Sequence, residues 1–487
     1  MSSANRPTSI LRIIFLIGWT VLFVALLQRD YFIKSLELKE AGIIKRDKEE
    51  SFLGIYLQDE RIGFVKNRLV QSSSDGFKLF QDAFLRLNIL NESHPVTMQV
   101  TADLTATLLL KKFTFRLSSP FYKMKAQGEV NGNDMRFTLT SGKETIEDIV
   151  RLKNPPFLST NQRGYLLTQG LHEGDKIKVP YFDPISLSGK NTVVEYRGLQ
   201  KILIHGRVYN LHHFIESYSG IRVNSWLDNQ GKVIKEESPA GFIFLSEPEF
   251  RATSIGAGSK EILSTVSVPV AGVVPDLQRL INMDYRLTLP DEGDFSLNQD
   301  RQSFKNGILH ITLEDMPEAN APVCSNKEDE LVSSPYIQAR NESIVQLGES
   351  LTQGIPSALA KVRSIADWVF HNLEKRPVLG IPDALTTLRT RRGDCNEHAV
   401  LFAALARSVA IPARVVAGVT FHEGAFYYHA WNEVCLDGTW LSLDTTKNQL
   451  PADISHIKFV EGEPRDMIKI GALLGKLQIE VLTESDR

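Results

Sequence analysis

Residues 391–407 read RRGDCNEHAVLFAALAR, a glycine and an aspartate followed by a run rich in alanine and leucine. Alanine and leucine favour helix, and Asp394 is a residue type that caps helix N-termini. Cys395 therefore lies in the first turn of a predicted helix, where free backbone N–H groups and the positive end of the helix dipole gather. Both features favour a thiolate, so the sequence predicts a reactive cysteine.

A predicted β-hairpin follows. Asp437-Gly438 separates two strand-like runs, HAWNEVCL from His429 and TWLSLDT from Thr439. Asp-Gly between such runs is a strong signal for a two-residue turn. Counting back from that turn puts Asp444 on the same face as His429, one diagonal step away, at about 7–8 Å between backbones. A carboxylate-to-imidazole hydrogen bond can span that separation.

These residues predict an ordered set of catalytic roles, with Cys395 as the nucleophile, His429 as the base and Asp444 as the group that orients the imidazole. Glu433 shares the face of His429, but it lies roughly 13 Å further along the strand. The nearest rival base is His398, which we interpret as structural because no carboxylate is placed to orient it. The sequence alone does not bring sulfur and imidazole together.

Four separated runs resemble the transglutaminase-like superfamily, over roughly residues 344–460. The resemblance implies a papain-like core with a Cys, His, Asp triad in that chain order, at Cys395, His429 and Asp444. Ala410 replaces the glycine usual in the family before Ile-Pro. The runs are GDC (393–395), IPARVVAG (411–418), HAWNEV (429–434) and WLSLDT (440–445).

Composition sets further limits. A chain of 487 residues predicts two to four domains, and a net charge of −3 gives no electrostatic case for nucleic-acid binding. Three cysteines argue against a disulfide framework and leave at least one free thiol. We interpret Cys324 as an incidental thiol in an exposed linker and Cys435 as a core residue. No pattern indicates a cofactor or a metal, and a zinc set of Cys395, His398 and His429 is disfavoured.

The N-terminus carries an apolar run at residues 10–27, preceded by Arg6. No small-residue cleavage site follows it, so an uncleaved membrane anchor over 1–30 is favoured above a signal peptide. A charged stalk over 31–50 comes next. A literal count of basic residues would keep the body in the cytoplasm, but long domains translocate largely regardless of charge. We expect a single-pass inner-membrane protein with its body on the periplasmic, outer side.

The rest of the chain predicts an α+β protein. Short alternating runs with turn signals indicate an antiparallel β-rich domain over 51–254. Residues 255–330 read as a small β segment and linker, either a separate sandwich or an extension of the next domain. Residues 331–487 form the predicted papain-like catalytic domain. His205, His212 and His213 lack a convincing metal-ligand spacing.

The expected function is a membrane-anchored cysteine enzyme that acts on amide bonds of a protein or peptide through a thioester. Hydrolysis is favoured over amine transfer because water needs no second binding site. The backbone N–H of Cys395 is the expected oxyanion donor, and the resemblance implies a second donor near residues 383–390. The alternatives are an inactive scaffold whose β-rich domain binds a protein partner, and a metal-dependent variant. Oligomeric state stays open.

Overall fold

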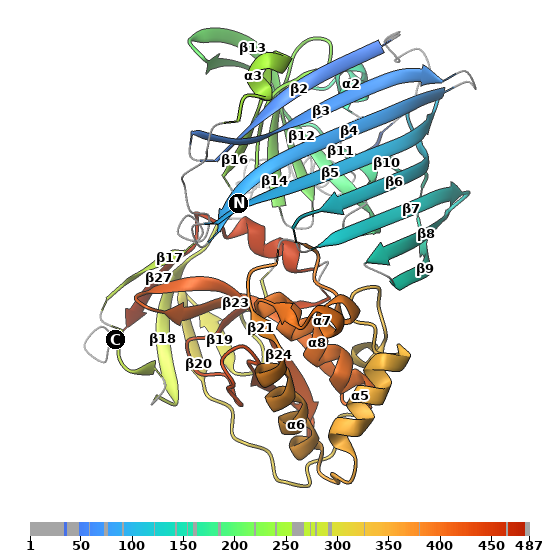
Figure 1. Ribbon diagram of the computed structural model, residues 1–487. Helices are drawn as coiled ribbons and strands as arrows, with labels where there is room; N and C mark the ends of the chain where they lie inside the picture. Colours follow the sequence, from blue (N-terminus) through green and yellow to red (C-terminus); the bar gives the residue numbers. More distant parts are fainter. Residues whose placement is uncertain are drawn as a thin grey trace, which may run out of the picture.

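The structure is a computed structural model that places the chain in two joined parts, a large β-sheet and a smaller body that holds the helices (Figure 1). The predicted anchor over residues 1–30, including the apolar run, lies outside the described residues. Within the described part, no helix has the length and apolar character needed to cross a membrane. The structure describes residues 34–36 and 48–482, except 58, 73–75, 90–91, 121, 142–143, 153, 159–162, 184–186, 219–220, 239–240, 256–266, 273, 278–279, 291–294, 326, 379 and 464–465.

The predicted fold class is only partly right, because strands dominate the molecule. Strands account for 52% of it, and the helices are few. The longer helices lie together beside the second sheet (Figure 1). The fold is therefore mostly β with a helical cluster, and the α+β description fits the second part alone.

The first part is one long antiparallel meander. Strands β2 to β9 each pair with the next strand in the chain, β11 to β16 do the same, and β16 pairs with β2 to join the two runs. The strands are β1 (Lys34–Ser35), β2 (Lys48–Leu57), β3 (Glu60–Ser72), β4 (Gly76–Ile89), β5 (Glu92–Thr105), β6 (Leu110–Ser118), β7 (Lys123–Asn131), β8 (Asp134–Ser141), β9 (Glu144–Arg151), β10 (Phe157–Leu158), β11 (Lys176–Asp183), β12 (Ser188–Ile204), β13 (Arg207–Tyr218), β14 (Ile221–Leu227), β15 (Val233–Glu237) and β16 (Phe242–Glu247).

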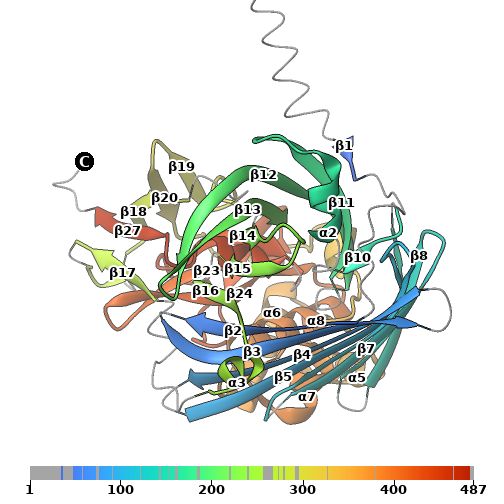
Figure 2. The same ribbon diagram turned by 90° about the horizontal axis from the view of Figure 1, so that it is seen from above.

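This meander curves back on itself, as the view from above shows (Figure 2). Phe113 of β6 and Phe182 of β11 meet with ring centroids 5.1 Å apart, in one buried apolar cluster. Side chains alternate along the strands, so apolar residues gather on one face, and strands β2 and β3 and strands β10 to β14 bury theirs in separate clusters. Short helical turns α2 (Arg163–Leu166), η2 (Leu167–Gln169) and α3 (Glu249–Ala252) accompany the sheet.

The second part is built on a sheet with the strand order β19-β20-β18-β27-β17-β24-β23-β26, and β25 pairs with β24. Its order does not follow the chain, because the last strand, β27, lies between β18 and β17. The strands are β17 (Val268–Ala271), β18 (Asn282–Thr288), β19 (Gln302–Lys305), β20 (Ile308–Thr312), β23 (Ala413–His422), β24 (Ala425–Leu436), β25 (Thr439–Leu443), β26 (Ile457–Gly462) and β27 (Gln478–Leu482).

Helix α8 (Cys395–Ser408) is the centre of the helical cluster. Every residue from Glu397 to Arg407 is buried, which explains the alanine-rich sequence, since small side chains let neighbours approach on all sides. The other elements are η4 (Glu328–Leu331), α5 (Glu342–Thr352), α6 (Ala358–Asn372), β21 (Glu374–Lys375), α7 (Ala384–Thr390), β22 (Arg392–Gly393) and η5 (Met467–Ala472).

Two predicted boundaries look different in the structure. Residues 34–35 and 48–50, expected in a stalk over 31–50, are strands of the large sheet. Within 255–330, strands β17 to β20 belong to the sheet of the second part, so these strands extend that sheet. The sequence left that choice open because the partner strand, β27, lies far away in the chain.

The reading of Cys324 and Cys435 as unpaired thiols is wrong. The two residues form a disulfide across a sequence separation of 111, and Cys395 is the free cysteine. The Cys324 backbone N–H also donates to the Cys435 carbonyl oxygen at 3.3 Å, so the linker is tied to the edge of the hairpin. The odd number of cysteines argued against disulfides, but two of the three form a bond and the third, Cys395, stays free.

The two parts contact each other through residues that precede helix α8 in the chain. Ser141 Oγ of β8 donates to Asp383 Oδ2 at 2.8 Å, and Asp383 in turn caps α7. Close by, a Cβ added to Gly380 would lie 2.4 Å from the Tyr122 ring, so this contact admits no side chain there. The β-rich domain therefore packs on the segment that leads to Cys395.

Candidate active site

The predicted helix start is confirmed at Cys395. Asp394 caps α8 by accepting a hydrogen bond from the Asn396 backbone N–H at 2.9 Å, and Glu397 completes a capping box by accepting from the Asp394 N–H at 2.9 Å. Gly393 is required by crowding, since a Cβ there would lie 2.1 Å from Glu397 Cβ. The GDC run thus fixes where the helix begins and where the thiol lies.

The predicted hairpin is also confirmed. Leu436 pairs with Thr439 and Asn432 with Leu443, the register that the Asp-Gly turn predicts. His429 Nε2 lies 2.8 Å from Asp444 Oδ2. Because this hydrogen bond uses Nε2, the ring nitrogen left for the thiol is Nδ1.

Strand β24 and helix α8 are held together at the level of the site. The buried Asn432 side chain donates to the Ala399 carbonyl oxygen at 2.9 Å, which links the strand to the first turns of the helix. The Ala430 backbone N–H is directed at the Cys395 sulfur and favours its thiolate form. The sulfur therefore lies at the residue that follows His429, while the direct contact between Cys395 and His429 stays a prediction.

The electrostatics around Cys395 oppose the simple expectation from its helix position. Burial raises the pKa of the Cys395 thiol well above its usual value, and the carboxylates of Asp394, Glu397 and Asp444 act in the same direction. The Ala430 N–H acts in the opposite direction. The capping box that orders the helix thus places two acidic side chains beside the sulfur, and burial together with Asp394 raises the pKa of Glu397 well above its ordinary value. A neighbouring proton acceptor is therefore needed to generate the thiolate.

Asp444 has more partners than the sequence revealed. Its Oδ1 accepts from Thr446 Oγ1 at 2.6 Å and from the Thr446 backbone N–H at 2.7 Å. Its Oδ2 faces His456 Nε2 at 3.0 Å as well as His429. Burial alone would raise the pKa of Asp444, but His429 and His456 hold it well below the ordinary value.

Sequence reasoning missed His456. It lies twelve positions after Asp444, in an irregular segment between β25 and β26 that offers no periodicity to place it. The only available signal was an unassigned histidine just before a buried strand. His456 is fully buried, and the Trp431 ring lies edge-on to it at 5.2 Å and stacks near His429 at 6.3 Å.

The Nδ1 atom of His398 lies 2.7 Å from the Asp394 carbonyl oxygen, and burial lowers the pKa of this imidazole. Glu433, the rejected rival to Asp444, is engaged elsewhere. It pairs with Arg414 at 2.6 Å and with Lys458 at 3.0 Å in a buried ion cluster.

Two groups of side chains within the described residues offer metal-ligand atoms within 4.8 Å of one another. In the first, His429, Asp444 and His456 are joined by direct hydrogen bonds. In the second, the carboxylates already face the cations of Arg414 and Lys458. That second group is Asp300, Glu433 and Glu461.

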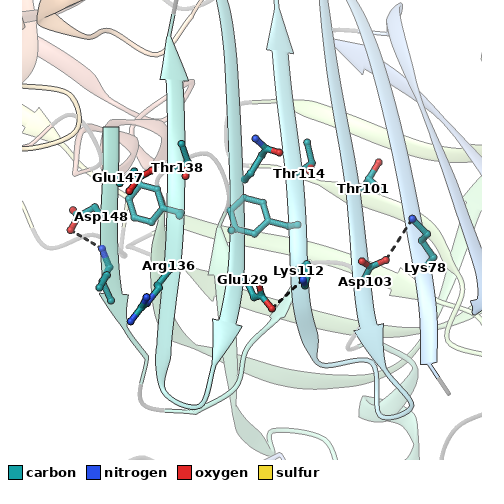
Figure 3. Close-up of a pocket in the computed structure, with 15 residues that line it drawn as sticks. Lys78, Thr101, Asp103, Lys112, Thr114, Glu129, Arg136, Thr138, Glu147 and Asp148 are labelled. Carbon is teal, nitrogen blue, oxygen red and sulfur yellow. Dashed lines mark hydrogen bonds and ion pairs between the residues drawn. The ribbon is translucent and has the colours of Figure 1, made fainter. Parts of the chain in front are cut away.

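Hollows in the described part of the chain include two outside this site. One of about 490 Å³ includes Lys447, Gln449 and Asp453 in its lining. The other, of about 850 Å³, lies on the polar face of β4 to β9, where Lys78 pairs with Asp103 and Lys112 with Glu129 (Figure 3). Arg136, Glu147 and Asp148 also line this hollow, so charges of both signs are present on this face.

Comparison with known proteins agrees with the geometry. Residues 345–445 match the family model described as the transglutaminase-like superfamily, and this part of the chain is a transglutaminase-like domain.

Among curated proteins, the kyphoscoliosis peptidase of Mus musculus is 25% identical over 225 residues. The match covers 40% of this chain and 31% of that protein, so the chain spans less than a third of its relative.

Two solved structures are also similar in part. A candidate cysteine protease from Cytophaga hutchinsonii is 20% identical, covering 41% of this chain and 83% of its own, with a TM-score of 0.27. A β-barrel-like protein of the DUF1849 domain of unknown function, from Brucella abortus, is 12% identical, covering 42% of this chain and 96% of its own, with a TM-score of 0.33.

Proposed function

We propose that the protein is a cysteine hydrolase that cleaves amide bonds of a protein or peptide through a thioester on Cys395. The observation that carries this proposal is the convergence of three elements. The helix start, the strand and the hairpin bring the Cys395 sulfur to the Ala430 N–H and His429 to Asp444. A nucleophile, a base and an orienting carboxylate in these positions are the parts that acyl transfer needs.

In this mechanism His429 Nδ1 takes the Cys395 thiol proton as the sulfur attacks the carbonyl carbon. The C–N bond then breaks, and the imidazolium gives that proton to the leaving amine. Water attacks the resulting thioester with His429 again as base, the C–S bond breaks, and the sulfur regains its proton. Asp444 holds the imidazole through Nε2 during both steps. The Cys395 N–H at the helix start is the proposed oxyanion donor.

The raised pKa of the thiol makes His429 central. A cysteine that ionised by itself would react without its base, but Cys395 is buried beside carboxylates. We expect thiolate to form only as an ion pair with the imidazolium. Hydrolysis is preferred to amine transfer because it requires no second substrate, and the curated relative is named as a peptidase.

The disulfide supports the expected compartment. Disulfides persist in oxidising environments outside the cytoplasm, and Cys324–Cys435 is such a bond. A periplasmic or external location, with the chain anchored through residues 10–27, therefore remains the proposal.

Alkylation of Cys395 by iodoacetamide tests the proposal directly. Cys324 and Cys435 are bonded to each other, so Cys395 is the single free thiol that can react without a reductant. We expect the native protein to react well below pH 8.5, the pKa of a free thiol being about 8.5. In the His429→Asn variant the alkylation rate of Cys395 should fall, and the increase of that rate with pH should occur at a higher pH than in the native protein. Equal pH profiles for the two proteins would contradict the proposal.

Activity assays then separate the outcomes. Hydrolysis of a quenched casein substrate, lost in Cys395→Ala, supports a peptidase, whereas incorporation of a fluorescent primary amine supports transfer. A chelator should leave the activity unchanged. If cells that carry Cys395→Ala have the same phenotype as cells with the native protein, the scaffold alternative is favoured, in which the β-rich domain binds a protein partner.

A further inference from the structure

We propose that His456 is a positioning residue of the same site, which holds Asp444 in the orientation that His429 requires. This inference rests on the proposed function. The two imidazoles approach one carboxylate oxygen from different segments of the fold, His429 from strand β24 and His456 from the irregular segment before β26, with His429 Nε2 at 2.8 Å and His456 Nε2 at 3.0 Å from Asp444 Oδ2. The hydrogen-bonded set is thus larger than a triad.

The burial of this pair gives the contact its weight. His456 is 0% exposed and Asp444 is 1% exposed, so water does not replace a lost partner. A buried carboxylate left short of a hydrogen bond costs more than an exposed one. Removing His456 would leave Asp444 Oδ2 with His429 as its only partner, and the carboxylate would be free to tilt about its bonds to Thr446.

The far side of the ring shows that His456 is itself fixed. Its Nδ1 lies 3.1 Å from Asp453 Oδ1 and 3.2 Å from the Asp453 carbonyl oxygen. Both ring nitrogens therefore face acceptor oxygens, and both bonds are made at once only by the doubly protonated ring. The result is a continuous chain from His429 through Asp444 and His456 to Asp453.

The chain ends at the hollow of about 490 Å³, which Asp453 lines together with Lys447. The Lys447 backbone N–H donates to Asp444 Oδ1 at 3.3 Å, and its ammonium bonds Thr420 Oγ1 at 2.8 Å. The charged or titratable groups close to the Asp444–His456 pair include His429, His398, Asp453, Lys447 and the Cys395 thiol.

A divalent cation held by His429, Asp444 and His456 is the competing reading. The geometry favours protons, because each nitrogen already lies at hydrogen-bond distance from the shared oxygen. A zinc ion would sit about 2.0–2.1 Å from each nitrogen and would require both to be deprotonated. The experiment below treats that reading as one of its outcomes.

The test compares the iodoacetamide rate at Cys395 across pH in the full chain. His456→Leu removes the donor at similar volume, and His456→Gln restores one N–H. We expect His456→Leu to react about 10- to 100-fold more slowly near pH 7, with its pH profile moved toward that of His429→Asn. His456→Gln should recover most of the rate. The exposed His422→Leu serves as the control and should match the native protein.

The outcomes are distinguishable from failure of the proposed function. Native rate and profile in His456→Leu, while His429→Asn is impaired, would overturn the positioning role alone. If His429→Asn also behaves as native, the proposed function fails with it. A stoichiometric transition metal that leaves in His456→Leu, with chelator-sensitive activity, would overturn this inference in favour of a metal site.

A folding defect in His456→Leu is covered by a second variant. Asp453→Asn keeps the His456 side chain and removes the charge that holds its Nδ1. We expect a smaller decrease in the alkylation rate, of a few fold, with the same direction of shift in the pH profile. A native profile in a folded Asp453→Asn protein would count against the chain of hydrogen bonds.

Discussion

The two sheets of this molecule are built in opposite ways. In the meander of β2 to β9, each strand pairs with the next one in the chain, and its charged side chains pair across strands at the surface, as with Lys112 and Glu129. In the sheet of the second part, β17 lies between β24 and the C-terminal β27, and charged groups such as Glu433 are buried among partners. Local pairing thus accompanies exposed charge in β2 to β9, and long-range pairing accompanies buried charge in the second sheet, whereas the β11 to β16 run holds the buried pair of Arg163 and Glu216.

The difference teaches where sensitivity to mutation lies. An exposed ion pair is screened by water and contributes little, whereas a buried charge depends on every partner it has. The candidate site depends on its partners in the same way, because the buried Asp444 carboxylate is held by groups from several segments. We therefore expect single charge substitutions to have large effects in the second sheet and small ones in β2 to β9 of the meander.

The largest effect is expected at the buried ion cluster. Glu433→Gln leaves Arg414 and Lys458 without their shared carboxylate, and breaking a buried pair costs about 3–5 kcal/mol. Urea unfolding measures the loss. Glu461→Gln, whose side chain is 25% exposed in the same cluster, is the matched control and should lose less. Equal losses in the two variants would break the contrast between buried and exposed charge.

The disulfide should come next. Replacing Cys324 and Cys435 together by serine opens a loop with a sequence separation of 111, at an expected cost of about 2–5 kcal/mol. Thermal unfolding checks the stability, with Cys395→Ser as a variant that keeps the disulfide. Mass spectrometry of the denatured native protein should show one alkylated cysteine without reductant and three with it. Three labels without reductant would mean that the bond does not form.

The next effect is the contribution of Asp444 to the free energy of unfolding, which should decrease at acid pH. Its folded-state pKa is held well below the ordinary value, so its contribution to stability is present above about pH 4 and is lost as the pH falls toward the folded pKa. The slope for one such group is about 1.4 kcal/mol per pH unit. Asp444→Asn should be less stable at neutral pH and show a shallower acid slope, while the exposed Asp148→Asn keeps the native slope. Denaturant titrations from pH 7 to 2 measure both.

The smallest effect is expected in the meander. Lys112 and Glu129 lie 3.1 Å apart, with side chains 57% and 49% exposed. Lys112→Gln should change the free energy of unfolding by about 0.5 kcal/mol or less, and added salt should reduce even that difference. Urea unfolding at low and high salt provides the measurement. A loss comparable to that of Glu433→Gln would remove the distinction between the two sheets.

Much of the site follows from local rules. Asp394 as a cap, the helix from Cys395 and the hairpin register depend on neighbours within a few residues, and each is found as predicted. The bond from His429 to Asp444 follows from that register, because alternation fixes which side chains share a face. The transglutaminase-like resemblance rests on these same runs, and it is confirmed for residues 345–445.

Other features needed the folded molecule. The Cys324–Cys435 bond and the partner strands of 268–312 join segments more than a hundred residues apart, and no local pattern encodes such pairs. His456 reaches Asp444 from an irregular segment, where neither alternation nor helical spacing predicts direction. The raised pKa of Cys395 is likewise a consequence of burial, which replaces the sequence-based expectation of a thiolate favoured by the helix dipole.

By itself, then, the sequence determined the capped helix and the hairpin, because these depend on short-range backbone preferences. It also supplied the candidate nucleophile, the candidate base and the carboxylate that orients the base. Only the tertiary structure decided which cysteines pair, which strands complete the second sheet, and that His456 is the second histidine in contact with Asp444. The physical reason is that burial and long-range contact arise from packing the whole chain, and they set the charge state of groups whose identities the sequence had already supplied.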